Sequence, residues 1–555
     1  MKRKKLLYMF MFVLLSVLVL AACGDGDADV ADSDTADYDT AETDDGETND
    51  DETDDENGAD ETDADNNVDG DRDIVIAFNN NILTLNPFES RTALDNNVIA
   101  AMAESLIDFD ENMELIGRLA ESFEVSDDSL THTFNLRQGI YFHDGEYFDA
   151  YAVLANVNFV LDEGEGAARW GTFRTIEEVN VIDQYTFEFI HNEPFMPFLE
   201  RLQPFRIVSP AQIESGDLDS GPIGTGQFIF REWVDGDRMV MDRNPDWRDA
   251  DQIGVDSITY RFVPENATRV AMLQSGEADI VYPMPHELLA QIEGDNNFYV
   301  EVRPSTVMRF VMMNQDVEPL DNLYVRRAMN YAIDVEAYAQ VVRGGFSSPA
   351  SSPISELLPF HYASDMYDHS VDTANDLLDE AGFPKGDNGV RFSLTLWAST
   401  DTTEIRAMEF LAQQWELVGI DVLVEPMEEG TLSDSIWGQT RETTEMNMWY
   451  VSWSAFDPDN ALRSPFMSTM HTPAGANANF YTNYDVDEAI MAGNAAPTFE
   501  ERYEYYAFAQ RQIVEDAVWI FLGADDRIVA RSARITGGGL QPTGNWLDLR
   551  TISVD

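Results

Sequence analysis

Leu119-Ala-Glu-Ser-Phe-Glu-Val-Ser-Asp-Asp128, with Leu136-Arg-Gln-Gly139 and Phe142-His-Asp-Gly145 shortly after it, carries the strongest fold signal in this chain. Thr131 to Leu136 alternates between polar and apolar residues, which predicts a half-buried strand. The dipeptide Asp-Gly within His143-Asp-Gly145 predicts a turn. This stretch is therefore expected to contribute strands joined by tight turns to a larger fold.

Outward from this stretch, strand and helix patterns alternate along the chain. The expected strands are Asp73 to Phe78, Ala278 to Tyr282, Ser305 to Asn314, Phe392 to Trp397, Asp421 to Glu425 and Val518 to Leu522. The expected helices are Asn96 to Ile107, Ala267 to Leu273, Tyr324 to Val342, Thr373 to Ala381, Thr403 to Val418 and Glu500 to Asp516. No repeat of 20–50 residues is visible. The pattern predicts a large α/β protein.

The composition is strongly acidic. The 555 residues include 34 Lys plus Arg and 103 Asp plus Glu, a net charge of −69, and 44% are hydrophobic. A nucleic-acid binder that neutralises phosphates needs clustered basic residues, so this class is excluded. Beyond Arg72 the only lysine is Lys385. Carboxylates in excess with few lysines predict a surface adapted to high salt or to an alkaline exterior, although an ordinary acidic secreted protein is the alternative.

The N-terminus has the pattern of an export signal. Lys2 to Lys5 are basic, Leu6 to Leu20 is an apolar run, and Leu20-Ala-Ala-Cys23 closes the segment. This arrangement resembles the bacterial lipobox, which implies a signal peptide over 1–22, cleavage before Cys23 and attachment of lipid to Cys23. The alternative is an uncleaved membrane anchor. Both place the body outside the cytoplasmic membrane, as on the surface of a Gram-positive bacterium.

Residues 23–72 are expected to form an acidic, disordered tether. Gly24 to Asp71 holds 23 acidic residues in 48 positions and no Lys or Arg. Such a segment buries too little apolar surface to fold, and its charges repel one another. Since Cys23 is the only cysteine, a disulfide framework and a thiolate-rich metal site are both excluded.

Several motifs, taken in order, resemble one family. Besides the stretch quoted first, they are Gly224-Thr-Gly226, Glu232-Trp233, Arg243-Asn-Pro245, Ala267 to Asp279, Val325 to Asp334 and Leu377 to Phe383. This set resembles the extracytoplasmic solute-binding proteins of the dipeptide, oligopeptide and nickel class. The resemblance implies an α/β, two-lobed periplasmic-binding-protein-like fold (type II, cluster C) with an extra subdomain in the first lobe. The implied parts are lobe I over 73–109, 210–305 and 527–555, the extra subdomain over 110–209, and lobe II over 306–526.

Within the family, the resemblance is greatest to the glutathione-binding branch. The segments concerned are Arg303 to Arg309, Val281 to Pro285, Leu394 to Ser399, Trp453 to Ala455, Ala461 to Phe466 and Asn479 to Tyr481. Peptide binders of the family often carry an Asp three residues after the tryptophan that matches Trp453, where it holds the ligand's ammonium. Here that position is Phe456, and Asp457 follows it. This departure favours a substituted or modified peptide over an ordinary dipeptide.

A peptide-like ligand presents a carboxylate, an ammonium and amide groups, and each needs a partner once it is buried. Arg309 is the candidate for the carboxylate, because its guanidinium can donate two parallel hydrogen bonds; the alternative is an interlobe salt bridge. Trp453 and Trp397 are candidates to stack on amide planes, or else belong to the core. The remaining candidates are Ser454, Asn479 and Tyr481 as neutral hydrogen-bonding groups, Asp457 or Asp459 for the ammonium, and Arg463 as a weaker second cation.

Signatures of enzymes are absent from the sequence. The seven histidines include no His-Glu-x-x-His pair, and there is no Gly-x-Ser-x-Gly elbow. We expect no catalysis, no cofactor and no metal. The sequence therefore predicts a monomeric, lipid-anchored binding protein that captures glutathione or a small peptide and delivers it to the permease of an ABC importer. The alternatives are a nickel chelate or an oligosaccharide as the ligand, a peptide-sensing surface receptor, and, least favoured, a secreted hydrolase.

Overall fold

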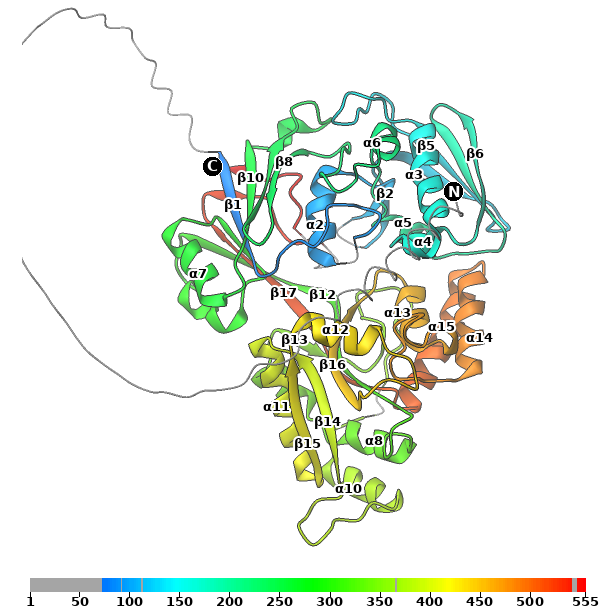
Figure 1. Ribbon diagram of the computed structural model, residues 1–555, viewed down its shortest axis with the longest axis vertical. Coiled ribbons are helices and arrows are strands. Elements are labelled where there is room, and N and C mark those ends of the chain that lie inside the picture. Colours follow the sequence, from blue (N-terminus) through cyan, green and yellow to red (C-terminus); the bar gives the residue numbers. More distant parts are fainter. Residues whose placement is uncertain (1–71, 91, 111–112, 365–366, 542–546) are drawn as a thin grey trace, which may run out of the picture. The chain divides into compact units, whose positions relative to one another are not determined.

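The computed structural model describes residues 72–90, 92–110, 113–364, 367–541 and 547–555 (Figure 1). An 11-stranded mixed sheet runs through this part in the order β15-β14-β16-β12-β17-β11-β1-β10-β9-β8, and β13 pairs with β17. Its strands are β1 Asp73–Phe78, β8 Phe228–Val234, β9 Arg238–Arg243, β10 Ser257–Phe262, β11 Ile280–Tyr282, β12 Phe298–Met313, β13 Ser347–Pro349, β14 Phe392–Ser399, β15 Ile420–Met427, β16 Met448–Ser454 and β17 Trp519–Ser532.

Two long strands join the two halves of this sheet. β12 has 16 residues and β17 has 14, and they pair from Phe298↔Ser532 to Met312↔Trp519. At one end β17 also pairs with β11 of the first lobe, whereas at the other end β12 pairs with β16 of the second lobe. The fold is therefore α/β and two-lobed, and the lobes share β12 and β17 (Figure 1).

The first lobe carries a second sheet, with order β4-β5-β7-β6. Its strands are β4 Ala120–Val125, β5 Thr131–Leu136, β6 Ile176–Asp183 and β7 Thr186–His191, and the short pairs are β2 Ile107–Phe109 with β3 Leu115–Gly117 and β18 Ile535–Thr536 with β19 Ser553–Val554. The helices of this lobe are α2 Ala93–Met102, α3 Ala150–Glu163, α4 Trp170–Phe173, α5 Phe198–Leu202, α6 Pro210–Ser215 and α7 Asn266–Ser275, with 3-10 turns at Gly164–Gly166, Ala250–Gln252 and His286–Gln291. Ile74 of the large sheet and Phe134 of the small one belong to one buried cluster. The two sheets therefore share a core, and the division into lobe I and a subdomain over 110–209 stays a prediction.

The second lobe has helices on both faces of its sheet. They are α8 Leu323–Tyr331, α9 Val335–Val341, α10 Val371–Glu380, α11 Thr402–Leu417, α12 Glu429–Trp437, α13 Pro458–Phe466, α14 Tyr484–Ala495 and α15 Phe499–Glu515, with a 3-10 turn at Ser468–Met470. Successive residues of β12 face opposite sides of the sheet. Phe310 and Met312 join the core beneath α13 to α15, whereas Val311 and Met313 join the core beneath α8 and α11. Within the described residues, no helix combines the length and the apolar character needed to cross a membrane.

Three of the motifs quoted above meet at one place in the first lobe. The backbone N–H of His143 donates to the carbonyl of Gly224 over 2.9 Å, and the side-chain amide of Asn244 donates to the carbonyl of Gly226 over 2.9 Å. The last turn of α2 lies so close that a Cβ at Gly226 would be 2.5 Å from the carbonyl carbon of Met102. Only glycine permits this approach. These motifs therefore hold the scaffold together.

Most expected elements are confirmed, but several of their boundaries are wrong; β12 begins at Phe298 rather than Ser305, and β17 extends to Ser532 rather than Leu522. β1 and β5 match the expected ranges residue for residue. The single helix expected over Tyr324 to Val342 is two helices, because Asp334 caps α9 by accepting from the backbone N–H of Ala337 over 2.9 Å. The helix expected to reach Ile107 ends at Met102, because Ala103 has an extended backbone.

Candidate ligand-binding site

Arg309 lies on β12 within a buried cluster of charges. Its Nε is 2.9 Å from Oδ2 of Asp525, and its Nη1 is 3.0 Å from Oε1 of Glu404. Nη2 of Arg343 lies 2.8 Å from the same Oδ2 of Asp525. Burial alone would raise the pKa of Asp525, but the guanidiniums of Arg343 and Arg309 outweigh it and hold that pKa below its usual value. A ligand carboxylate at Arg309 would have to share the guanidinium with these two carboxylates.

The two candidate tryptophans lie on the other face of the same sheet. Trp453 on β16 pairs with Met308, whereas Arg309 pairs with Ser452, so the side chains of Trp453 and Arg309 point to opposite faces. The Trp453 ring nitrogen donates to the carbonyl of Asn460 over 3.3 Å. Trp397 is buried on β14, and its ring nitrogen donates to Oε2 of Glu425 over 2.9 Å. Both indoles pack against the core beneath α13 to α15.

Asn479 and Tyr481 lie in the connection between α13 and α14, inside the second lobe. The amide of Asn479 donates to the carbonyl of Pro465 over 3.0 Å and accepts from the ring nitrogen of Trp519 over 2.9 Å. The hydroxyl of Tyr481 donates to Oδ2 of Asp516 over 2.7 Å, and burial is the main cause that raises its pKa. These contacts tie both residues to the core of their own lobe.

Ser454 is the last residue of β16, and Asp457 caps the start of α13 three positions later. The hydroxyls of Ser454 and Thr306 are 2.9 Å apart. Asp457 caps α13 by accepting from the backbone N–H of Asn460 over 2.8 Å, and its other oxygen is 3.5 Å from Nε of Arg201 in the first lobe.

Asp459 binds two guanidiniums. Its Oδ2 lies 2.8 Å from Nη2 of Arg201, and its Oδ1 accepts from Nε of Arg463 over 2.7 Å. The weaker cation candidate, Arg463, is thus paired within its own helix.

The structure brings Trp453, Ser454 and Asp457 together on one segment, and it sets Arg309 apart from the tryptophans. Sequence reasoning missed Arg201, Glu404 and Asp525, which pair with candidate residues, and Arg343, which pairs with Asp525. The only available signal for Arg201 is a charged pair inside the apolar segment Phe198-Leu-Glu-Arg-Leu202. Cys23 lies outside the described residues. Within the described part of the chain, no group of three His, Cys, Asp or Glu side chains could hold a metal ion.

Comparison with known proteins places this arrangement in a family. The model of the bacterial extracellular solute-binding proteins, family 5, matches residues 114–473. The chain belongs to this family. Relatives include the glutathione-binding protein GsiB of Pectobacterium atrosepticum, 32% identical over 478 residues, which cover 85% of this chain and 92% of the relative. The glutathione-binding protein GsiB of Escherichia coli O157:H7 has the same identity and coverage.

Solved structures of similar shape confirm the two-lobed fold of this family 5 protein. NikZ from Campylobacter jejuni in complex with Ni(L-His) has a TM-score of 0.78 at 24% identity, over 87% of this chain and 100% of that one. The dipeptide binding protein from Pseudoalteromonas sp. SM9913 in complex with Met-Leu has a TM-score of 0.77 at 22% identity, with the same coverage. At these identities the likeness concerns the fold.

Proposed function

We propose that this family 5 protein captures glutathione or a small peptide between its two lobes and delivers it to an ABC importer. The observation that carries the proposal is the 32% identity to glutathione-binding proteins along 85% of the chain. The family motifs run in order along the described body, and the contacts of Gly224, Gly226 and Asn244 hold the first lobe together. Import is powered by separate ATPase subunits, since this chain carries no nucleotide motif.

The proposal includes a lipid anchor at Cys23 on the extracytoplasmic face of the membrane, with the acidic segment as a tether. Support for it is the basic, apolar and small-residue order that ends at Cys23. Growth of cells with labelled palmitate checks the anchor, because the wild-type protein should carry the label and a Cys23→Ala variant should not. The GsiB relatives come from Gram-negative bacteria, so a Gram-positive source stays a prediction.

The charged groups at the lobe junction favour a ligand with both signs of charge. Arg309 provides a guanidinium on β12, and Asp457 provides a carboxylate at the start of α13. In a chain with a net charge of −69, an anionic ligand needs a local cation of this kind. We retain Arg309, Trp397, Trp453, Ser454, Asp457, Asn479 and Tyr481 as the proposed ligand-binding set.

Calorimetric titration of the body lacking residues 1–71 tests the function. Reduced glutathione should bind near micromolar, about −8 kcal/mol, at both low and molar salt. The matched control is the α-linked tripeptide Glu-Cys-Gly, which has the same composition but a different backbone. Met-Leu and nickel–histidine complete the panel.

Each outcome of this titration has a distinct meaning. Preference for glutathione over the α-linked tripeptide supports the glutathione assignment. Tight binding of Met-Leu alone would keep peptide capture and replace the ligand. Binding of the nickel complex alone, or of nothing in the panel, would contradict the proposed function.

A further inference from the structure

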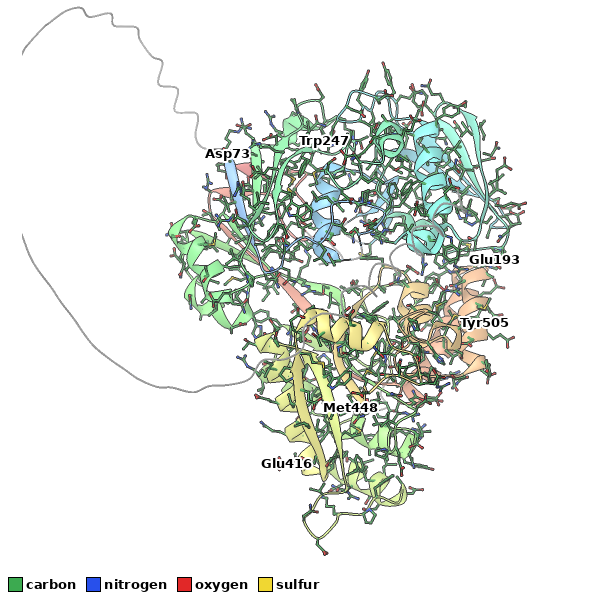
Figure 2. The ribbon with its side chains drawn as sticks, viewed as in Figure 1. Asp73, Glu193, Trp247, Glu416, Met448 and Tyr505 are labelled. Carbon is green, nitrogen blue, oxygen red and sulfur yellow. The ribbon has the colours of Figure 1, made fainter. Side chains whose placement is uncertain are left out.

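The two lobes also meet away from their shared strands. Arg201 on α5 of the first lobe contacts Asp459 on α13 of the second, and both helices lie on the side of the molecule away from the crossing of β12 and β17 (Figure 1). Glu193, shortly before α5, and Tyr505 on α15 are labelled on that side (Figure 2). The backbone N–H of Met196 donates to the carbonyl of Asn494 over 2.9 Å. The contact is therefore a second junction, made by segments almost 300 residues apart in sequence.

Arg201 is the charged centre of this junction. Its Nη2 is 2.8 Å from Oδ2 of Asp459, and its Nε is 3.5 Å from Oδ2 of Asp457. The Arg201 side chain is 15% exposed, that of Asp457 3% and that of Asp459 0%. Burial opposes the charge on Arg201, but the two carboxylates outweigh it and raise the pKa of Arg201. Removing one partner of a buried ion pair costs much more free energy than removing one partner of an exposed pair, because the remaining charge is left buried.

The second lobe holds its carboxylates in place without help from Arg201. Asp459 accepts from Arg463 over 2.7 Å and from the side-chain amide of Asn494. Asn494 is fixed in turn by the hydroxyl of Tyr506, which donates to its Oδ1 over 2.7 Å. Asp457 accepts a hydrogen bond from the backbone N–H of Asn460, and this bond also lies within the second lobe. If the lobes separate, these carboxylates stay partnered.

The first lobe likewise provides an interaction that Arg201 keeps when the lobes separate. The guanidinium carbon lies 5.5 Å from the centre of the Phe195 ring, within range of a cation–π interaction, and Phe195 belongs to the same lobe. Water can solvate the guanidinium once Asp457 and Asp459 move away. Only the contacts across the junction are lost on opening, so the pairing is suited to repeated opening and closing.

We propose that Arg201, bound to Asp457 and Asp459, is a latch that holds the lobes closed around a captured solute. The inference rests on the proposed function, because it takes the solute to lie between the lobes. Arg201 is a positioning residue: it bridges the lobes and sets how long the closed form lasts. Removal of the latch therefore accelerates dissociation of the solute and has little effect on its association, as is usual when a closed complex is destabilised.

The test compares Arg201→Met with Arg231→Met. Arg231 pairs with Asp242 on the exposed β8–β9 hairpin of the first lobe, so its variant controls for the loss of one arginine. Stopped-flow measurement with reduced glutathione should show a rate constant of dissociation raised about 10-fold or more in Arg201→Met, with association changed less than about threefold. Arg201→Lys should be intermediate, since lysine keeps the charge and loses the planar fork.

A second measurement needs no ligand and separates failure of the latch from failure of the proposed function. Small-angle X-ray scattering of the solute-free body should give a larger radius of gyration for Arg201→Met than for wild type and Arg231→Met. Asp457→Asn, which keeps the residue's size and can still accept from Asn460, should shift the radius in the same direction and so covers a failure of Arg201→Met to fold. If wild type binds no glutathione but the radius shifts, the latch stands and the glutathione assignment fails. An unchanged radius together with unchanged dissociation overturns the latch.

Discussion

Asp525 shows how strongly a single residue constrains the candidate site. Its carboxylate is completely buried and is held by Arg309 and Arg343, and Arg309 also binds Glu404. The ring of Tyr450 lies 5.7 Å from the Arg309 guanidinium carbon, so one side of the guanidinium faces an aromatic ring. Arg309 thus has a structural role whether or not it also binds a ligand.

The two roles of Arg309 can be separated by one substitution. Arg309→Met should lower the free energy of unfolding by about 3 kcal/mol, because Asp525 and Glu404 each lose a buried cationic partner. Urea unfolding measures this loss, and Arg231→Met, at an exposed pair, should change it by less than about 1 kcal/mol. Calorimetry on the folded variant measures the ligand role: glutathione affinity lower by roughly 2–5 kcal/mol means that the guanidinium binds the ligand carboxylate. Unchanged stability would contradict the structural role.

At the scale of elements, the sequence pattern predicted those strands whose boundaries depend on their own residues. β1 and β5 match their predicted ranges because their apolar residues alternate or run together within six positions. β12 and β17 are longer than expected, because pairing between the lobes extends them past their apolar runs into polar residues such as Arg303 and Arg527. The motif residues Gly224 and Gly226 were recognisable in sequence, whereas their purpose, the close approach of α2, required the structure.

The site was less predictable than the fold. Asp457 could be named from its segment, but its partner Arg201 lies 256 positions earlier and in the other lobe. The opposite orientation of Arg309 and Trp453 depends on the register between β12 and β16, which no local pattern specifies. The sequence thus identified segments that carry candidate site residues. Which of their side chains can contact one ligand depends on the pairing of strands and lobes in the folded protein.

Two neighbouring strands of the small sheet carry a histidine pair that predicts acid sensitivity. His132 on β5 and His191 on β7 are buried, with ring centres 4.8 Å apart and Phe198 against both. Burial lowers the pKa of His132 to about 4, and burial together with the charge of His132 lowers that of His191 to about 3. Unfolded histidine titrates near 6.5, so between pH 6.5 and 4 the unfolded chain binds more protons. The stability from these neutral rings is complete above pH 6.5 and is lost as pH falls toward 4.

His132→Phe tests this, because phenylalanine keeps an aromatic ring against Phe198 and cannot be protonated. Between pH 7.5 and pH 5, wild type should lose about 2 kcal/mol more unfolding free energy than the variant does. Denaturant unfolding at each pH gives the difference, and His369→Gln, at an exposed histidine, is the control. Equal losses in wild type and His132→Phe would show that His132 does not contribute to acid sensitivity.

At the scale of the whole molecule, charge is the dominant feature. Residues 73–555 contain Lys385 as their only lysine, and acidic side chains outnumber basic ones throughout this body. Many of its arginines are committed to ion pairs, such as those at Asp108, Asp459 and Asp525, so the remaining carboxylates repel one another across the surface. Self-repulsion of this kind destabilises the compact state and is weakened by salt.

We therefore expect the melting temperature of the body lacking residues 1–71 to rise by about 5 °C or more between 0.02 and 2 M NaCl. The Debye length falls from about 20 Å to about 2 Å over this range, so surface repulsion is almost removed at the upper end. Buried pairs such as Arg309–Asp525 are screened much less, which means that the gain must come from the surface. Equal gains in KCl and choline chloride at the same ionic strength would identify screening as the cause, whereas a gain in one salt alone would indicate binding of a specific cation. A melting temperature that stays constant or falls with salt would contradict adaptation of this surface to high salt, and an alkaline exterior or an ordinary acidic secreted protein would then remain as explanations for the scarcity of lysine.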